Sequence, residues 1–257
     1  MTRRAEEASG EPLGGLTPAA ADKRRGGDDA SRRRLLAAVS GGGSLIFVTT
    51  LVLAASLYPG GTWADRSTVG HSFFGNFLCD LMQHRALNGE PTELGSLLAR
   101  IGSVAMFAAL ASFFLQIVRL EETPTIRGRI TRRAGLFAAI VSCSVPLLTS
   151  DRFRTAHVIA VVASFLPAFV ATVAGFGICL RSPRSTRLIK GAALVAVIAG
   201  GIDGFLYAFA YGAYAVDLRP PGDVRRLVND LLPLLQRIAT LGLLAWVLAL
   251  TLRTARR

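Results

Sequence analysis

Six long apolar stretches constrain the fold of this chain more than any other feature. Each contains 17 to 24 residues with almost no charged side chains. Because a helix rises about 1.5 Å per residue, stretches of this length match a hydrocarbon core about 30 Å thick. We therefore predict transmembrane helices at 35–57, 101–118, 134–150, 157–180, 191–214 and 231–252.

The composition agrees with a membrane protein. Hydrophobic residues make up 51% of the 257 residues and charged residues 18%, whereas about a quarter of the residues in a soluble domain are charged. Continuous apolarity without two-residue alternation favours helices over a β-barrel. The predicted fold is all-α, a polytopic bundle of six transmembrane helices over residues 35–252. A soluble enzyme, a coiled coil and a disordered regulator are excluded.

The distribution of basic residues predicts the orientation. The segments 1–34, 119–133, 181–190 and 253–257 hold 20 of the 29 Lys and Arg residues, and the alternate segments hold eight. Because basic residues concentrate on the cytoplasmic side, we expect a multi-pass protein of the cell (cytoplasmic or inner) membrane with both termini in the cytoplasm. The net charge of +12 is then a topology signal and does not indicate nucleic-acid binding.

The two ends of the chain are predicted to lie outside the membrane domain. Residues 1–34 mix Gly, Ala and Pro with charges of both signs, which is typical of a disordered cytoplasmic tail. Residues 253–257 form a short cytoplasmic end. The run Ser31-Arg32-Arg33-Arg34 resembles a twin-arginine export signal. Since five further spans follow, we expect a retained first span, with a cleaved signal as the alternative.

The segment between the first two spans is the most informative loop. Within 71–84, Phe74, Phe77, Leu78 and Leu81 fall on one helical face, and Asn76, Asp80 and His84 repeat every four residues on another. This pattern predicts an outer amphipathic helix at the membrane interface, with its polar face turned toward the mouth of the bundle.

Within the predicted spans the only Asp, Glu, Lys, Arg or His residues are His157, Asp203 and Arg237. A charge at membrane depth is costly unless it is paired, so we expect Asp203 and Arg237 to meet in the outer half of the bundle. A structural ion pair and a contact with a ligand are both open interpretations. Tyr207 lies one helical turn from Asp203 and is expected to bond it or a ligand.

A short outer turn places Asp151 near His157, at the level of the outer interface. An ordinary polar hairpin and one wall of a site are both compatible with this turn. The predicted outward-facing polar site, for which no catalytic residue is identified, comprises Asn76, Asp80, His84, Asp151, His157, Asp203, Tyr207 and Arg237.

Two short motifs support a family resemblance. Tyr58-Pro59-Gly60-Gly61-Thr62 and Asn76-Phe77-Leu78-Cys79-Asp80-Leu81, followed by the Asp151 turn, resemble a bacterial group of uncharacterised six-span membrane proteins related to the eukaryotic Frag/DRAM/Sfk membrane proteins. The resemblance covers roughly residues 35–252. Cys79 and Met82 stand where the family pattern has Ser and Gly. The resemblance implies Pro59, Asn76 and Asp80 as family-type positions, a link to membrane-lipid organisation and no established reaction.

Three functions compete on this basis. The leading hypothesis is a non-enzymatic protein that binds or organises membrane lipid through the polar site, where Arg237 would suit a phosphate. An intramembrane metal-dependent hydrolase would use His71, Asp80, His84 and His157 as ligands, although their spacing fits no compact zinc signature. An ion-coupled carrier would use Asp203. We expect no cofactor, no bound metal and no nucleic-acid partner, and a second copy or another membrane protein is a possible partner.

Overall fold

The computed structural model of this protein describes residues 18–212 and 222–255, and all its regular elements are helical. They are α1 (Pro18–Ser56), the 3₁₀-helix η1 (Leu78–Met82), α2 (Glu93–Val118), α3 (Ile126–Ser142), α4 (Arg154–Arg181), α5 (Arg187–Tyr207), the π-helical turn η2 (Ala208–Gly212) and α7 (Gly222–Ala255). The predicted all-α fold is confirmed for this part of the chain.

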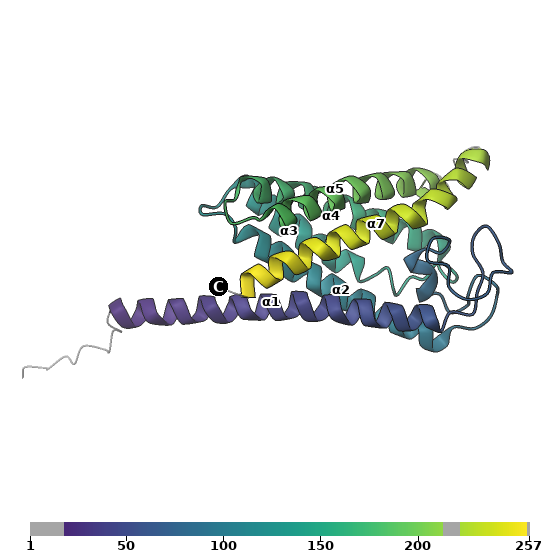
Figure 1. Ribbon diagram of the computed structural model, residues 1–257, viewed down its shortest axis with the longest axis horizontal. Coiled ribbons are helices and arrows are strands. Elements are labelled where there is room, and N and C mark those ends of the chain that lie inside the picture. Colours follow the sequence, from purple (N-terminus) through teal and green to yellow (C-terminus); the bar gives the residue numbers. More distant parts are fainter. Residues whose placement is uncertain (1–17, 213–221, 256–257) are drawn as a thin grey trace, which may run out of the picture.

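The long helices run side by side in one elongated bundle (Figure 1). The segment 57–92, hereafter the outer loop, covers one end, which we call the loop end. At the opposite end α7 finishes, α1 extends past the other helices, and short turns join α2 to α3 and α4 to α5 (Figure 1). We call this the terminal end. The outer loop and the short 143–153 turn are thus held at the same end.

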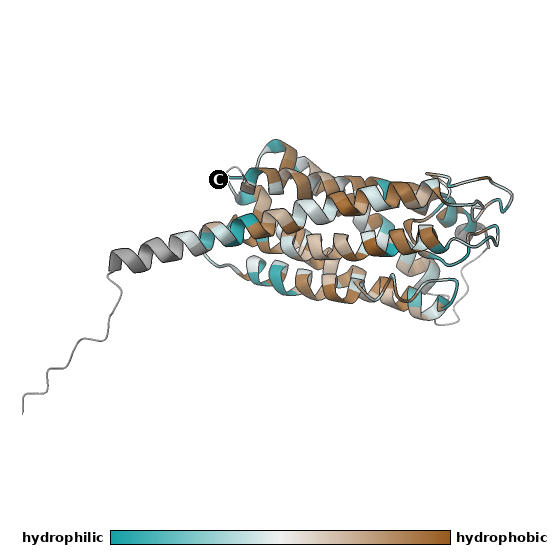
Figure 2. Ribbon diagram, turned by 90° about the horizontal axis from the view of Figure 1, so that it is seen from below, coloured by the Kyte–Doolittle hydropathy of each residue, from teal (hydrophilic) through white to brown (hydrophobic). Residues whose placement is uncertain are grey.

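Five helices in the described residues are long and apolar enough to cross a membrane: Asp29–Ser56, Glu93–Val118, Arg154–Arg181, Arg187–Tyr211 and Arg226–Ala255. Large apolar side chains on them face outward, including Leu45 at 68% and Ile198 at 53% exposed. Hydrophobic residues cover the middle of the bundle and hydrophilic ones gather at its ends (Figure 2). Apolar surface of this extent marks contact with lipid or another apolar partner.

The third helix differs from the prediction. A span at 134–150 was expected, whereas α3 runs from Ile126 to Ser142. It starts early because the Thr125 hydroxyl accepts a hydrogen bond from the Gly128 N–H (3.2 Å) and because arginines are good helix formers. It ends before Pro146, since the residue preceding a proline disfavours helical geometry.

The helices at the two ends of the chain are longer than predicted. Residues 18–34, expected to be disordered, form the first part of α1. The last helix begins at Gly222 rather than 231 and continues to Ala255. The alanines and arginines in these extensions favour helix, although the low hydropathy of the arginines places these segments outside an apolar stretch. Residues 1–17, 213–221 and 256–257 of the predicted tail, fifth span and cytoplasmic end lie outside the described residues.

Small residues bring α1 and α2 close together. A Cβ atom at Gly43 would lie 2.5 Å from the Ala105 carbonyl oxygen. The Ser40 hydroxyl donates to the Ala109 carbonyl (3.1 Å) and the Ser112 hydroxyl to the Leu36 carbonyl (2.7 Å). Such small-residue contacts and interhelical hydrogen bonds are the usual means by which helices associate in lipid.

The predicted amphipathic helix over 71–84 is wrong. The outer loop instead forms turns, with only the five-residue η1 as regular structure. Asn76 and Asp80, expected on a helical face turned toward the mouth of the bundle, are not on a helical face: Asn76 is completely buried and Asp80 is 2% exposed. In the absence of a helix, their side chains accept hydrogen bonds from backbone N–H groups of the loop.

Candidate functional site: a cavity beneath the outer loop

Asn76 ties two parts of the outer loop together. Its Nδ2 group donates to the Gly61 carbonyl (2.9 Å), and its Oδ1 atom accepts from the Ser72 N–H (2.9 Å). Gly61 has a φ of +86°, which only glycine adopts without strain. The glycine turn and Asn76 therefore specify one loop conformation.

Asp80 is the centre of the buried hydrogen-bond network. Its carboxylate accepts from the Phe77 N–H (2.8 Å), Gln83 Nε2 (3.0 Å), Trp63 Nε1 (3.3 Å) and Asn76 Nδ2 (3.4 Å). A buried carboxylate needs such partners, because an unsatisfied charge in a low-dielectric region is costly. The pattern of Asn76 and Asp80 that suggested a helical face instead reflects these contacts.

Burial raises the pKa of Asp80 to about 6, while the hydrogen bonds and the charge of Arg237 act in the opposite direction. Desolvation favours the neutral carboxyl, and N–H donors favour the carboxylate. Asp80 is therefore expected to change its protonation state near neutral pH.

The outer loop is anchored to the turn between α3 and α4. Gln83 Nε2 donates to the Ser150 hydroxyl (2.9 Å), and the His84 N–H donates to Asp151 Oδ2 (2.9 Å). Asp151, predicted near His157 in a short turn, thus also contacts the outer loop. The Asp151 carboxylate accepts a hydrogen bond from the His84 N–H, and Asp151 also lines the cavity described below.

Arg100 of α2 provides a second anchor. Its Nε and Nη2 atoms both donate to the Met82 carbonyl (3.0 Å each), and Nη2 lies 2.7 Å from His84 Nε2. Since arginine has no acceptor atom, His84 Nε2 accepts in this contact and the ring is neutral. Burial and the nearby arginine charges lower the pKa of His84, in agreement with that state.

Arg237 of α7 forms hydrogen bonds with the outer loop and does not pair with Asp203. It donates through Nη2 to the Asn76 carbonyl (2.8 Å) and through Nε to the Phe73 carbonyl (3.1 Å), and its guanidinium lies 5.1 Å from the Phe73 ring centroid. Within the described residues no ion pair joins Arg237 to Asp203, so the predicted pair is wrong. The planar guanidinium fork matches two loop carbonyls that need donors.

A cavity of about 630 Å³ lies between the outer loop, the α3–α4 turn and the halves of α4, α5 and α7 nearest the loop end. Ligand pockets commonly have volumes of about 300–1,000 Å³. One part of its wall is apolar and is formed by α4 residues Val158, Val161, Val162 and Phe165. The rest of the lining mixes charged and polar groups with apolar side chains such as Phe77, Ala86 and Leu87. The cavity thus combines an apolar strip on α4 with a charge-bearing lining elsewhere.

Five of the eight predicted site residues line this cavity: Asp80, Asp151, His157, Asp203 and Tyr207. Asn76 lies behind Asp80, to which it donates. His84 and Arg237 are not in the wall, and Arg237 instead borders a separate apolar hollow of about 280 Å³ between α1 and α7. Most of the predicted site residues therefore lie around one cavity, but Arg237, the only cation predicted for the site, does not line it.

Two groups in the wall have distinct hydrogen-bonding states. His157 Nδ1 lies 2.7 Å from the Leu148 carbonyl oxygen, so Nδ1 carries a proton and donates to it. Among the described residues the Asp203 carboxylate forms no hydrogen bond and no ion pair. Asp203 is thus available to a ligand.

Sequence reasoning missed the cavity's own cations and several of its neutral polar groups. Arg66 and Arg85 of the outer loop and Arg154 at the start of α4 all line it, as do Trp63 and Gln236. The arginines were counted only as flanking charges. Gln236 was hidden inside an apolar stretch, although its Oε1 atom accepts from the Leu78 N–H (2.8 Å) and so joins α7 to η1. The position of Gln236 directly before Arg237 in an apolar stretch is the sequence feature that could have identified it.

The four residues considered as metal ligands do not converge. His71 borders the hollow that contains Arg237, His84 contacts Arg100, and His157 and Asp80 line the cavity. No group of three or more His, Cys, Asp or Glu side chains in the described part of the chain is arranged to hold a metal ion.

Comparisons with protein-family models, with curated proteins and with solved structures find no significant match to this chain.

Proposed function

We propose that this is a six-span membrane protein that binds an amphipathic ligand, such as a membrane lipid, in the cavity beneath the outer loop. The observation that carries the proposal is the mixed lining of that cavity. Arginines of the outer loop and of the start of α4 supply its positive charge, and α4 side chains from Val158 to Phe165 supply an apolar strip. A headgroup and an acyl chain have this same division.

The charged part of the wall suits a headgroup that contains an anion. Arg66, Arg85 and Arg154 supply guanidinium groups, which make charge-assisted hydrogen bonds to phosphate. These residues take the role that the sequence assigned to Arg237. Asp203, without a donor among the described residues, suits a cationic or hydroxyl-bearing part of the same headgroup.

The membrane arrangement belongs to the same proposal. In this proposal α3 also crosses the membrane, which brings the number of spans from five to six. The outer loop lies outside and both termini lie in the cytoplasm, because the basic segments lie at the terminal end. The resemblance to the Frag/DRAM/Sfk-related group also stays a proposal. Two of its residues, Asn76 and Asp80, hold the outer loop over the cavity.

A substitution that fills the cavity tests this function. Protein purified from membranes in mild detergent would be examined by native mass spectrometry and lipid extraction. Val162→Trp should reduce the bound lipid by about tenfold or more, because the indole occupies the acyl side of the cavity. Ile159 lies on the same helix, but its side chain is exposed. The control Ile159→Trp should therefore leave the amount of bound lipid unchanged. Equal lipid retention by both variants and the wild type would refute the proposal.

A second candidate, an ion-coupled carrier, rests on Asp203 alone. An intramembrane carboxylate without a donor in the described residues and facing a cavity is a typical ion- or proton-binding group. This function requires a pH-dependent flux in proteoliposomes that Asp203→Asn abolishes. If that variant transports as the wild type does, the carrier hypothesis is wrong.

A further inference from the structure

The terminal end of the bundle holds a cluster of arginines that the cavity does not use. Arg33 of α1, Arg119 directly after α2, Arg184 between α4 and α5, and Arg253 of α7 line one hollow of about 90 Å³. They come from four elements that are far apart in the sequence. We call this set the arginine cluster.

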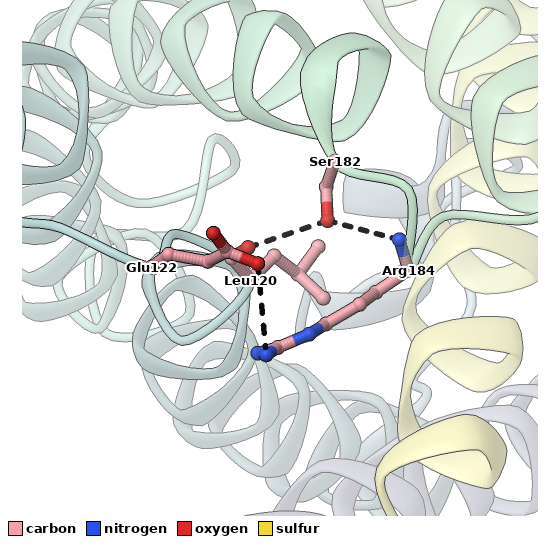
Figure 3. Close-up of polar contacts among 4 residues, drawn as sticks. All are labelled: Leu120, Glu122, Ser182 and Arg184. Carbon is pink, nitrogen blue, oxygen red and sulfur yellow. Dashed lines mark hydrogen bonds and ion pairs between the residues drawn. The ribbon is translucent and has the colours of Figure 1, made fainter.

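The turn that carries Arg184 is fixed by hydrogen bonds rather than by its charge. The Ser182 hydroxyl donates to the Leu120 carbonyl (3.3 Å), and the Arg184 N–H donates to the Ser182 oxygen (3.2 Å), which ties the α4–α5 turn to the end of α2 (Figure 3). The position of the Arg184 backbone is therefore set without any anion in the hollow.

The cluster has little negative charge to balance it. Arg184 Nη2 lies 4.0 Å from Glu122 Oε1, and the Glu122 side chain is 74% exposed (Figure 3). An ion pair so exposed is weak. No acidic residue is among those that line the hollow, and this is the one ion pair within the described residues. The remaining arginine charges lack an acidic partner there.

Two buried polar atoms at the hollow also lack partners in the described part of the chain: Arg253 Nε and Gln116 Oε1. The Gln116 amide nitrogen is already used, since it donates to the Leu36 carbonyl (3.1 Å). Buried polar groups are normally hydrogen-bonded, so an unpaired donor beside a hollow indicates a missing partner. For Arg253 Nε that partner must be an acceptor.

Simpler causes explain only part of the cluster. Arg119 and Arg253 lie at the C-terminal ends of α2 and α7, where the helix dipole favours a cation. Arg33 lies inside α1 and Arg184 in a turn, so neither is explained in this way. The positive-inside preference accounts for basic residues at this end, but not for their convergence from four elements on one hollow.

We propose that the arginine cluster binds a phosphoryl group, from the headgroup of an anionic lipid or from a soluble phosphate compound. Guanidinium groups bind phosphate oxygens in a bidentate fashion, which gives arginine an advantage over lysine at such sites. The volume exceeds the roughly 10–15 Å³ that one ordered water needs. This site lies at the opposite end of the bundle from the cavity and does not depend on the function proposed there.

The test uses the full-length purified protein and two probes. Inorganic phosphate would be titrated at constant ionic strength against chloride, and native mass spectrometry would count phosphatidylglycerol retained from equimolar micelles with phosphatidylcholine. In the double variant Arg184→Gln/Arg253→Gln we expect affinity for the bound probe to fall by about tenfold or more. Binding of phosphate alone would identify a soluble ligand, and retention of phosphatidylglycerol alone would identify a lipid headgroup.

Two further variants keep the test decisive. Arg129→Gln/Arg132→Gln removes the same charge from exposed positions of α3 at the same end and should bind as the wild type does. Arg184→Lys/Arg253→Lys keeps the charge and the fold but loses the bidentate geometry, so it should bind more weakly with an unchanged melting temperature. The proposal fails if neither probe is preferred over chloride or phosphatidylcholine. It also fails if the α3 control loses as much affinity as the Gln variant, or if both cluster variants bind normally.

Discussion

At the scale of single residues, the Asp80 carboxylate determines how the outer loop covers the cavity. Because four N–H groups donate to it, Asp80→Ala would leave several buried donors without an acceptor. We expect this substitution to lower the free energy of unfolding by about 1–3 kcal/mol or more. Thermal unfolding in detergent measures the effect. Glu90→Ala serves as the control, since Glu90 is exposed and its side chain accepts only from the half-buried Asn88. Equal effects of the two substitutions would contradict this role.

The protonation of Asp80 predicts a pH dependence. Its pKa is raised from 3.8 to about 6 by burial, so the folded state favours the neutral carboxyl. The protonation of Asp80 therefore stabilises the folded state in full below pH 3.8, and this stabilisation is lost as the pH rises through about 6. Relative to Asp80→Asn, which cannot ionise, the wild type should lose stability between pH 4 and 7. The melting temperatures of both proteins across this range test it. Parallel profiles would show that the N–H donors keep Asp80 ionised throughout.

The sequence predicted which polar residues line the cavity better than it predicted their hydrogen-bond partners. Asp80, Asp151, His157, Asp203 and Tyr207 could be identified because ionisable or hydroxyl groups are rare and costly near apolar spans. Partner choice depends on geometry that spacing along one helix does not contain. Arg237, for example, is satisfied by two loop carbonyls, and backbone acceptors are invisible in a list of charged residues.

At the scale of elements, the contact between α1 and α2 gives a matched test. A Cβ atom at Gly43 would lie 2.5 Å from the Ala105 carbonyl oxygen and 2.9 Å from the Ala109 Cβ, whereas a Cβ at Gly42 meets nothing within 4 Å. Gly43→Ala should therefore force the helices apart and destabilise the protein by about 1–3 kcal/mol. Gly42→Ala should be neutral or stabilise α1 by about 0.5–1 kcal/mol, because alanine favours helix. Melting temperatures that change equally in both variants would contradict this packing.

Hydropathy located the apolar spans better than the elements around them. The five long apolar helices follow directly from stretches too apolar for water. The third helix was misplaced because its first half carries Arg127, Arg129, Arg132 and Arg133, which hydropathy excludes but helix propensity permits. The outer loop was misread for a different reason: its polar residues repeat every four positions, yet the bends around Ser72–Phe77 place them inward without a helix.

At the scale of the whole molecule, the structure and the charge distribution together predict a topology. Residues 90 and 152 lie at the loop end, where the His84 N–H donates to Asp151, and residue 185 lies at the terminal end with the arginine cluster. The segments 1–34, 119–133, 181–190 and 253–257 hold 20 of the 29 basic residues, and their described parts lie at the terminal end. That end should therefore face the cytoplasm. Reporter fusions at residues 90 and 152 should therefore report the outside, and fusions at 123 and 185 the cytoplasm.

The fusions at 123 and 152 decide whether α3 is the sixth span. Its 17 residues reach only about 25 Å, slightly less than the roughly 30 Å of hydrocarbon. The 143–150 turn must supply the remaining depth, and its apolar Val145, Leu147 and Leu148 suit that position. Because α3 joins the terminal end to the loop end, the reporters at 123 and 152 must fall on opposite sides if the bundle crosses the membrane as one body. If both report the same side, α3 does not cross, and the cavity cannot open to the outside as proposed.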